Sequence, residues 1–586
     1  MILQALADYY RRKCDDPDPA QRLPMFGLEQ KEIPFLLEIS VEGELLQMRD
    51  TRELQEKKKV AQTFRVPLGV KKTSGVAANL LWDTLEYVLG VDTKGKPERV
   101  AEQHAAFRAR IVALPASARE DAGIQAVAGF LEHIDLAQLE RQPAWSDVLE
   151  SNAVLSFRLQ GDLDLVCQRP AVVNEVLNVS ADEDARQAMC LVTGELAPVE
   201  RLHASIKGVW GAQTSGANIV SFNARAFESY GKTERQGENA PVSRAAAFAY
   251  TTALNHLLRK DSPQRIQVGD ASTVFWAERD SEFETSAPDI FGDPPKDDPD
   301  SGTRAVHALM EAVHSGRLAG PDGDTRFYVL GLAPNAARIS IRFYHCLPLR
   351  ELGQRIVQHF ADLSLARGPH DPQYPSLFRL LAAVAVQNKA DNIPPNLGGA
   401  IMDAIFAGVN TPYPSLWLNA AVSRCRAEQH VNYLRAAAIK ACLNRQMRYA
   451  QLSSPNPSPE QEFLPMLDLS NPNPAYRLGR LFAVLEKIQE EASPGLNATI
   501  RDRYYGAASS TPVAVFTTLL RLKNAHLKKL AVGRTTWFEK LLGEVLGPVT
   551  DFPKHLPLPD QGRFALGYYH QRQDFFTRRS AEPGVD

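Results

Sequence analysis

The pattern of apolar and polar positions divides the chain into two parts. Up to about residue 350, helical and strand-like periods alternate, beginning with apolar residues at helical spacing over residues 2–12. Beyond that point strand-like runs fade, and alanine- and leucine-rich helical runs dominate. The sequence therefore predicts an α+β fold, with a mixed α/β N-terminal part that contains antiparallel hairpins and an all-helical C-terminal bundle.

Two hairpins are predicted from paired strand-like runs. Residues 33–39 and 44–48 flank the turn Val41-Glu-Gly43, and residues 326–333 and 337–344 flank Pro334-Asn335. Further strands are predicted over 64–66, 154–166 and 274–277, and helices over 76–90, 98–140, 184–190 and 242–259. The C-terminal helical runs are 351–366, 376–388, 399–408, 415–449, 474–492, 497–506, 512–531 and 535–546.

The change of character predicts a domain boundary, with an N-terminal domain over 1–365 and a helical domain over 366–586. Residues 278–300 hold nine carboxylates against two basic residues, so an acidic, solvated linker or loop is expected there. The proline-rich stretch 453–459 is a second candidate linker.

Composition changes this picture little. The chain of 586 residues has 66 Lys+Arg against 69 Asp+Glu, so a nucleic-acid site has to be a local basic patch. Six cysteines are spread along the chain without a CxxC pair, which is typical of reduced thiols in a cytosol. No signal peptide and no apolar window of membrane-spanning length is found, so a cytoplasmic protein without membrane association is expected.

Catalytic motifs are weak throughout. Gly231-Lys-Thr233 lacks the earlier glycine that a phosphate-binding P-loop needs, because position 226 is alanine. His370-Asp371 is flanked by prolines and lacks further ligands at metal-binding spacing. We expect no catalytic residue, no metal site and no cofactor.

The segment from Arg201 to Arg265 is the most informative, with nine basic and four acidic residues. Its centre joins Lys207-Gly208 to Gly211-Ala-Gln-Thr-Ser-Gly216. Small residues let a backbone approach a duplex, and amide, hydroxyl and lysine side chains bind base edges and phosphates. The predicted DNA-contacting residues are Lys207, Gln213, Thr214, Ser215, Asn218 and Asn223. The alternative is a glycine-rich hairpin over a core with solvated polar residues.

Two further sites are predicted from short patterns. Lys71, Lys72, Ser74 and Asn79 are expected to form a second DNA-facing loop, although lysines also commonly solvate a surface. Strand alternation over 338–343 would turn Arg338 and Arg342 to one side, toward nucleic acid or a neighbouring subunit, and Ile339, Ile341 and Phe343 toward the core. The alternative for the arginines is ordinary surface ion pairing.

Several stretches together resemble one family, the large subunit of the type I-C CRISPR surveillance complex (Cascade). They are the opening Met1-Ile-Leu-Gln-Ala-Leu6, the Ser74–Gly90 region, the GAQTSGA–SFN–AFESYG block, Tyr328–Asn335 with Arg338 and Arg342, and Asn473–Arg480. The resemblance implies a non-enzymatic subunit that holds the 5′ end of the CRISPR RNA and reads the protospacer-adjacent motif (PAM) on double-stranded DNA. It also implies help in strand separation and R-loop stabilisation, docking of a separate helicase–nuclease, and contact with backbone and guide-end subunits.

The helical tail resembles the family's small subunit, which is also made separately from an internal start. Residues 466–586 carry 16 Lys+Arg and 12 Asp+Glu, and Met466 stands after the proline-rich stretch where such a start is expected. The competing hypotheses are a stand-alone metal-dependent nuclease and a purely structural bundle protein.

Overall fold

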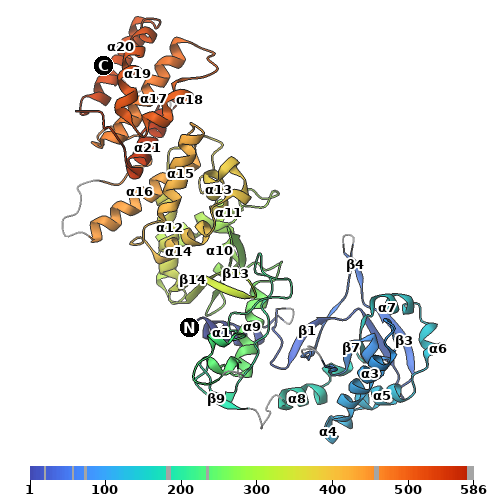
Figure 1. The fold of residues 1–586 in the computed structure, drawn as a ribbon. Helices are drawn as coiled ribbons and strands as arrows, with labels where there is room; N and C mark the ends of the chain where they lie inside the picture. The colour runs from blue at the N-terminus through green and yellow to red at the C-terminus, as the bar shows by residue number, and fades with distance from the viewer. Residues whose placement is uncertain are drawn as a thin grey trace. The chain divides into compact units, whose positions relative to one another are not determined.

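The computed structural model describes residues 1–576, apart from residues 19–20, 56–57, 71–74, 180–185, 233–235 and 454–460. The chain forms two compact units (Figure 1). The first contains Leu3–His203 and Phe222–Ala253, and the second contains Ala204–Ser221 and Leu254–Asp586. The second unit thus includes a short excursion of the chain, residues 204–221, that comes from the middle of the first. The predicted functional division between 1–365 and 366–586 stays a prediction.

A four-stranded sheet forms the centre of the first unit. Its strand order is β3 (Leu45–Asp50), β2 (Phe35–Ile39), β8 (Val154–Leu159) and β7 (Trp82–Thr84). β2 pairs antiparallel with β3, which confirms the hairpin predicted around Gly43, and parallel with β8. Phe157 of β8 packs against Phe107 of α3 (Pro97–Val112) and Phe130 of α5 (Ala122–Glu132), so these helices share a core with the sheet.

Short elements complete the first unit. Three antiparallel pairs join β1 (Leu28–Glu32) to β6 (Thr63–Pro67), β4 (Glu53–Gln55) to β5 (Lys58–Val60) and β9 (Gln187–Met189) to β10 (Leu196–Pro198). The remaining helices are α1 (Ile2–Cys14), α2 (Leu85–Val88), α4 (Ala116–Arg119), α6 (Leu136–Glu140), α7 (Trp145–Ser151), η1 (Val166–Gln168), α8 (Pro170–Val179), η2 (Arg225–Phe227) and η3 (Gln236–Asn239). Helix α9 (Arg244–Leu257) contributes residues to both units.

The second unit begins with an antiparallel sheet in the order β11 (Arg265–Val268), β12 (Ala271–Ala277), β13 (Arg326–Asn335) and β14 (Arg338–Pro348). β12 is buried along its whole length, as expected for an apolar central strand. β13 and β14 confirm the hairpin predicted around Pro334-Asn335. This sheet carries the candidate site described below.

Helices make up the rest of the second unit. They are α10 (Phe283–Phe291), α11 (Ser301–His314), η4 (Arg317–Ala319), α12 (Leu349–Leu363), α13 (Leu377–Val384), η5 (Val386–Asn388), η6 (Ala390–Asn392), α14 (Leu397–Ala407), α15 (Ser415–Ala427), α16 (Tyr433–Ser453), α17 (Pro474–Ala492), α18 (Ile500–Ala508), α19 (Pro512–Leu527), α20 (Val532–Leu546) and α21 (Leu558–Asp574). After β14 the described residues contain no strand, which confirms the α+β class with a helical C-terminal region.

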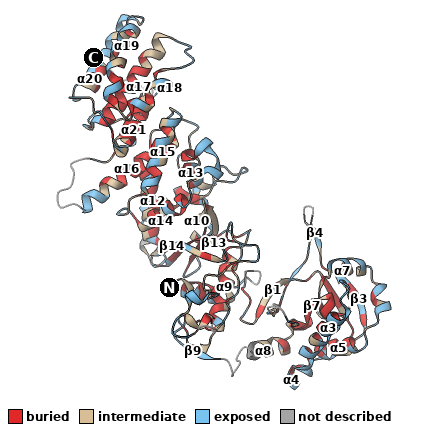
Figure 2. Cartoon of the chain, viewed as in Figure 1, coloured by how far each residue is buried: buried red, intermediate tan, exposed pale blue. Residues whose placement is uncertain are grey.

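One hydrophobic core runs from the sheet through these helices, and Figure 2 shows buried residues along most of α17 and α21. These two helices touch backbone to backbone, because a Cβ on Gly479 would lie 2.0 Å from the Phe564 carbonyl oxygen. Buried charges are paired: Arg445 Nε donates to Asp362 Oδ2 over 2.9 Å with both side chains inaccessible. The helical region is therefore one tightly packed body.

Several predicted elements are wrong. The helix expected over 76–90 is mostly an irregular segment followed by β7 and the single turn α2, because Leu81 has φ +63° and cannot continue a helix. Residues 187–189 of the expected helix over 184–190 form β9, while residues 184–185 lie outside the described residues. The run 415–449 is two helices, broken where Gln429 has φ +47°.

The acidic stretch 278–300 is only partly a loop. Residues 283–291 form α10, whose Ala287, Ile290 and Phe291 are buried in the core. Apolar residues at helical spacing outweighed the surrounding carboxylates, most of which are exposed. Glu284 is the buried exception, and its Oε1 accepts from the N–H of Ala277 over 2.7 Å. The second linker candidate, 453–459, lies outside the described residues except for its first residue, which ends α16.

Candidate nucleic-acid interface

The excursion 204–221 forms a closed loop on the second unit. Ile206 and Ala217 exchange both backbone hydrogen bonds, at 2.8 and 2.9 Å, and so close residues 207–216, which we call the glycine loop. Inside it, the N–H of Ala212 donates to Val209 O and the N–H of Gly216 donates to Gln213 O. The loop is therefore a pair of tight turns on a two-residue base.

Glycine is required at two positions of the loop. Gly208 has φ +84°, and a Cβ there would lie 2.5 Å from the carbonyl oxygen of Leu258. Gly216 has φ +93°, and a Cβ there would lie 2.8 Å from the carbonyl oxygen of Ile206. Both positions combine a left-handed backbone with a close approach that a larger residue cannot make.

The loop is fastened to the sheet and to α9. The backbone N–H of Trp210 donates to Ser272 Oγ of β12 over 2.9 Å, and that hydroxyl donates to Gln267 Oε1 of β11. The backbone N–H of Lys207 donates to Asn255 Oδ1 of α9 over 2.7 Å. These side-chain acceptors hold the loop backbone in place while its polar tips remain at the surface.

The chain leaving the loop pairs with the β13–β14 hairpin. The N–H of Asn218 donates to Ala337 O over 3.3 Å, and the N–H of Ile339 donates to Asn218 O over 3.0 Å. This parallel bridge sets Asn218 beside Arg338. The structure thus brings together two candidate regions, around Gln213 and Arg338, that the sequence separates by more than a hundred residues.

The polar tips of the glycine loop are accessible. Lys207, Gln213, Thr214 and Ser215 are all exposed. Asn218 is half-buried, and its side-chain amide donates to Ala204 O over 3.2 Å, so part of its hydrogen-bonding capacity is used locally. Four of the predicted contacts therefore lie together on one exposed loop.

The surroundings of the loop are basic. The hairpin 326–348 contains three arginines, Arg326, Arg338 and Arg342, and no carboxylate. Arg265 donates from Nη1 to Leu258 O, the carbonyl that Gly208 approaches, over 2.6 Å, and burial lowers the pKa of this guanidinium. The region favours a polyanion.

The expected alternation along β14 holds for Ile339 and Phe343, which are buried, but is wrong for Ile341. On β13, Gly331 and Leu332 are consecutive, but they pair with Phe343 and Ile341 of β14, so Arg342 is an extra residue in a β-bulge. As a result Ile341 is 42% exposed instead of lying in the core. Arg342 forms an ion pair with Asp270 over 3.0 Å, which is the ordinary surface role considered for it. This pairing makes Arg342 a weaker candidate for an intermolecular contact than the sequence pattern indicated.

The second predicted DNA-facing loop cannot be compared directly. Lys71, Lys72 and Ser74 lie outside the described residues. Asn79 is 5% exposed, and its Oδ1 accepts from the N–H of Val70 over 2.9 Å, so its side chain fastens the start of that loop instead of facing solvent. Asn223 is exposed but belongs to the first unit, not to the unit that carries the glycine loop.

Sequence reasoning missed Trp210 and Asn255. Trp210 lies between Gly208-Val209 and Gly211, and 66% of it is exposed. An aromatic residue flanked by glycines was the available signal for Trp210, because such a side chain has little local surface to pack against. Asn255 gave no such signal, because its role depends on the fold.

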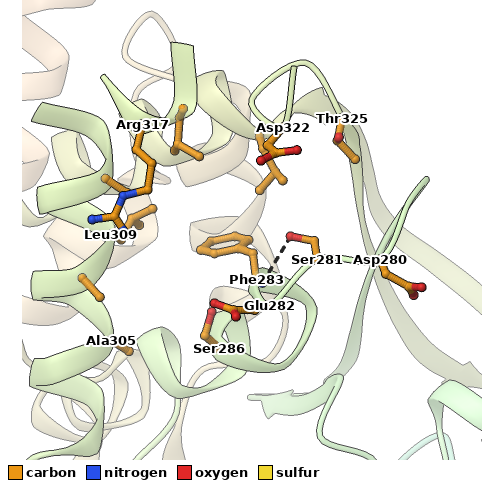
Figure 3. A pocket seen from close by; sticks show the side chains of 14 residues that line it. Asp280, Ser281, Glu282, Phe283, Ser286, Ala305, Leu309, Arg317, Asp322 and Thr325 are labelled. Carbon is orange, nitrogen blue, oxygen red and sulfur yellow. Dashed lines mark hydrogen bonds between the residues drawn. The ribbon is translucent and has the colours of Figure 1, made fainter. Parts of the chain in front are cut away.

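A cavity of about 410 Å³ lies elsewhere in the second unit, between α10, α11, η4 and the ends of β12 and β13 (Figure 3). Phe283, Leu309 and Leu318 contribute to its apolar lining, and its polar lining consists of Asp280, Ser281, Glu282, Ser286, Arg317, Asp322 and Thr325. Figure 3 shows Glu282 on one side of the Phe283 ring and Asp322 on the other. Carboxylates at this position disfavour phosphate, so the cavity is not part of the basic region.

The described residues form neither a metal-binding cluster nor a membrane-spanning helix. No group of three or more His, Cys, Asp or Glu side chains comes together there in a way that holds a metal ion. Among the same residues, no helix is both long and apolar enough to span a bilayer.

Met466 lies in the segment before α17 and is 64% exposed. The helix itself begins at Pro474, and Asn473 Oδ1 accepts from the N–H groups of Ala475 and Tyr476 as an N-cap. The residues after Met466 therefore begin with an irregular segment and a well-capped helix.

The surface described here is a glycine loop paired with a hairpin that holds three arginines and no carboxylate. Comparison with protein families places the chain among CRISPR-associated proteins. A family model described as CRISPR-associated protein (Cas_Csd1) matches residues 6–576. The chain therefore belongs to the Cas_Csd1 family. Membership indicates a CRISPR-associated large subunit of the Cascade type. No curated protein matches the chain.

Proposed function

We propose that this protein is the non-catalytic large subunit of a type I-C RNA-guided complex and that it reads the PAM on double-stranded DNA. The observation that carries the proposal is the backbone pairing of Asn218, which follows the glycine loop, with Arg338 of the β13–β14 hairpin. The exposed Lys207 and Gln213 belong to the loop that this pairing joins to the hairpin. Family membership supports the setting in a Cascade-type complex.

The contacts divide into two kinds. Lys207 and Arg338 bind phosphates, which position the duplex without reading its sequence. Gln213 reads base edges, because its amide both donates and accepts hydrogen bonds, and Thr214 and Ser215 add hydroxyl groups beside it. The glycines have no side chains, so the loop backbone can approach a DNA groove closely and its polar side chains can enter it. The rest of the target is recognised by base pairing with the guide RNA.

The remaining parts of the proposal concern the assembly. The subunit helps separate the target strands, stabilises the R-loop and docks a separate helicase–nuclease. Its partners are the CRISPR RNA, the backbone and guide-end subunits, and small subunits made from its own C-terminal region. Lys71, Lys72 and Ser74 add phosphate contacts, and the complex acts in the cytoplasm.

The test measures binding of the assembled complex to a library of duplexes with randomised PAM positions. Gln213→Ala should weaken binding to the preferred PAM by about 1–3 kcal/mol and broaden the preference. Lys207→Ala should weaken binding to all sequences and reduce the slope of log K against log salt by about 0.9. Lys296→Ala, an exposed lysine of the acidic stretch, is the matched control and should leave both quantities unchanged. A Gln213→Ala complex with wild-type preference and affinity would refute the assignment.

Arg338 is tested separately from Arg342. Arg338→Ala should weaken target DNA binding while the complex still assembles. Arg342→Ala should mainly remove the ion pair with Asp270, so its effect on DNA binding should be smaller. If Arg342→Ala weakens DNA binding as much as Arg338→Ala does, the ion pair with Asp270 does not keep Arg342 from contacting DNA.

Internal initiation is tested at Met466. Met466→Leu keeps an apolar side chain at an exposed position, so it should leave the fold intact. Loss of the short C-terminal product, with the full-length chain still present, would support internal initiation.

A separate assay tests the non-catalytic role by incubating the isolated chain with DNA and Mg²⁺. Cleavage that is abolished by a single carboxylate substitution would contradict that role.

A further inference from the structure

Trp210 is the most exposed tryptophan of the protein. The chain has six tryptophans, all among the described residues. Trp210 is 66% exposed, Trp537 is 36% exposed, and the other four are buried or partly buried. A large aromatic ring left in water on a folded protein marks a binding surface more often than a smaller apolar residue does.

The backbone beneath this ring is held in place. The N–H of Trp210 donates to the buried Ser272, and the preceding Val209 is 5% exposed. On either side, Gly208 approaches Leu258 O and Gly211 lies near Pro334, where a Cβ would be 3.3 Å from its Cγ. The indole is therefore presented from a rigid base, so little conformational entropy is lost when a partner covers it.

The charge around the ring indicates what covers it. Lys207 is the one charged residue of the glycine loop, and it is exposed. The neighbouring hairpin adds arginines and no carboxylate between residues 326 and 348. A ligand that combines a flat apolar face with negative charge matches this surface, and a nucleobase on its phosphate backbone has both properties.

We propose that the indole of Trp210 stacks on an unpaired nucleobase of the nucleic acid held by the glycine loop. The proposal rests on the proposed function and adds a contact of a different kind. Every base has a π face, so stacking contributes affinity without sequence preference, whereas Gln213 supplies preference. Trp210 thus lets the loop bind an unpaired base at the point where the strands of a duplex separate.

The experiment uses the full-length chain and a single-stranded oligothymidylate as the probe. Binding should quench the tryptophan fluorescence, because Trp210 is the most exposed of the six. Trp210→Ala should abolish most of the quenching and weaken binding about 5- to 150-fold. Trp210→Phe keeps a stacking ring without the indole, so it should retain most of the affinity and lose the quenching.

Two further variants make the result specific. Trp537→Ala removes the next most exposed indole, whose ring is already covered by Arg534 at 4.1 Å, and should leave affinity unchanged. Lys207→Ala tests the loop itself. If Trp210→Ala binds like the wild type while Lys207→Ala binds less well, stacking is refuted and the proposed function stands.

The other outcomes are equally distinct. If both Trp210→Ala and Lys207→Ala bind like the wild type, the glycine loop does not bind single-stranded nucleic acid and the stacking proposal is refuted. The proposed function fails as well only if the same variants also leave binding to the PAM duplex library unchanged. If Trp210→Ala binds the oligonucleotide normally but the complex loses a subunit on purification, the ring contacts a protein and stacking is refuted. A thermal melt equal to wild type should accompany the Trp210 variants, since this side chain is mostly exposed.

Discussion

Replacing Gly208 with alanine tests whether the shape of the glycine loop matters for binding. The new Cβ would lie 2.5 Å from Leu258 O, about 0.9 Å short of ordinary van der Waals contact. That oxygen also accepts from Arg265 Nη1 over 2.6 Å, so it cannot retreat without breaking a charge-assisted hydrogen bond. The loop itself must therefore move.

The magnitude has two parts. A non-glycine residue at φ +84° costs about 1 kcal/mol, and forcing a methyl group into a packed contact costs about 1–3 kcal/mol more. If the loop stays docked, urea denaturation should show a free energy of unfolding about 2–4 kcal/mol lower. If the loop lifts off, stability changes less, but the bond from Lys207 N–H to Asn255 is lost and duplex binding falls at least tenfold.

Gly495→Ala is the matched control. Gly495 has φ +81°, and a Cβ there would meet nothing within 4 Å, so the substitution carries the backbone cost alone. It should lower stability by about 1 kcal/mol and leave the affinity for the PAM duplex, measured by fluorescence anisotropy, unchanged. The reasoning is refuted if Gly208→Ala matches Gly495→Ala in both stability and affinity.

Three further predictions concern the helical region, each followed by urea denaturation. Burial alone would raise the pKa of Asp362, but Arg445 and Arg448 hold it below its usual value. Asp362→Asn leaves Arg445 buried without a counter-charge, so it should lower the free energy of unfolding by about 3–5 kcal/mol. A loss below about 1 kcal/mol would contradict this. Burial lowers the pKa of His359 to about 3, so below about pH 6.5 the unfolded state binds a proton that the folded state does not. The free energy of unfolding should therefore fall by up to about 1.4 kcal/mol per pH unit in that range, and His359→Gln should flatten this slope. Gly479→Ala should force α17 away from Phe564 and cost at least about 3 kcal/mol, whereas an unchanged midpoint would show that the helices separate freely.

The elements that sequence patterns predicted well are those with local causes. The turn Pro334-Asn335 between two apolar runs specified the β13–β14 hairpin, and the proline after Asn473 marked the start of α17. The helix expected over 76–90 failed because apolar spacing does not reveal that Leu81 takes a left-handed backbone. Helix α21 was missed because its residues are buried nearly all round, which removes the amphipathic period.

The candidate site divides in the same way. Residue type alone singled out Lys207, Gln213 and Arg338. That Asn218 pairs with the strand containing Arg338 follows from backbone hydrogen bonds across the fold, and no local pattern encodes that pairing. The bulge at Arg342 likewise results from pairing with β13, so strict alternation along the strand gave the wrong face for Ile341.

Helix α21 sets an order of events during synthesis of the chain. It packs on α15 and α16, where Gly562 meets Leu418 and Ile439, yet those helices leave the ribosome long before it. Until α21 arrives, their apolar face is uncovered and is available to chaperones or to aggregation. A product initiated at Met466 would contain α21 but lack α15 and α16, so the face of α21 that packs on them would be exposed. In the full-length chain α15 and α16 cover that face, whereas in the short product it would be open to other molecules.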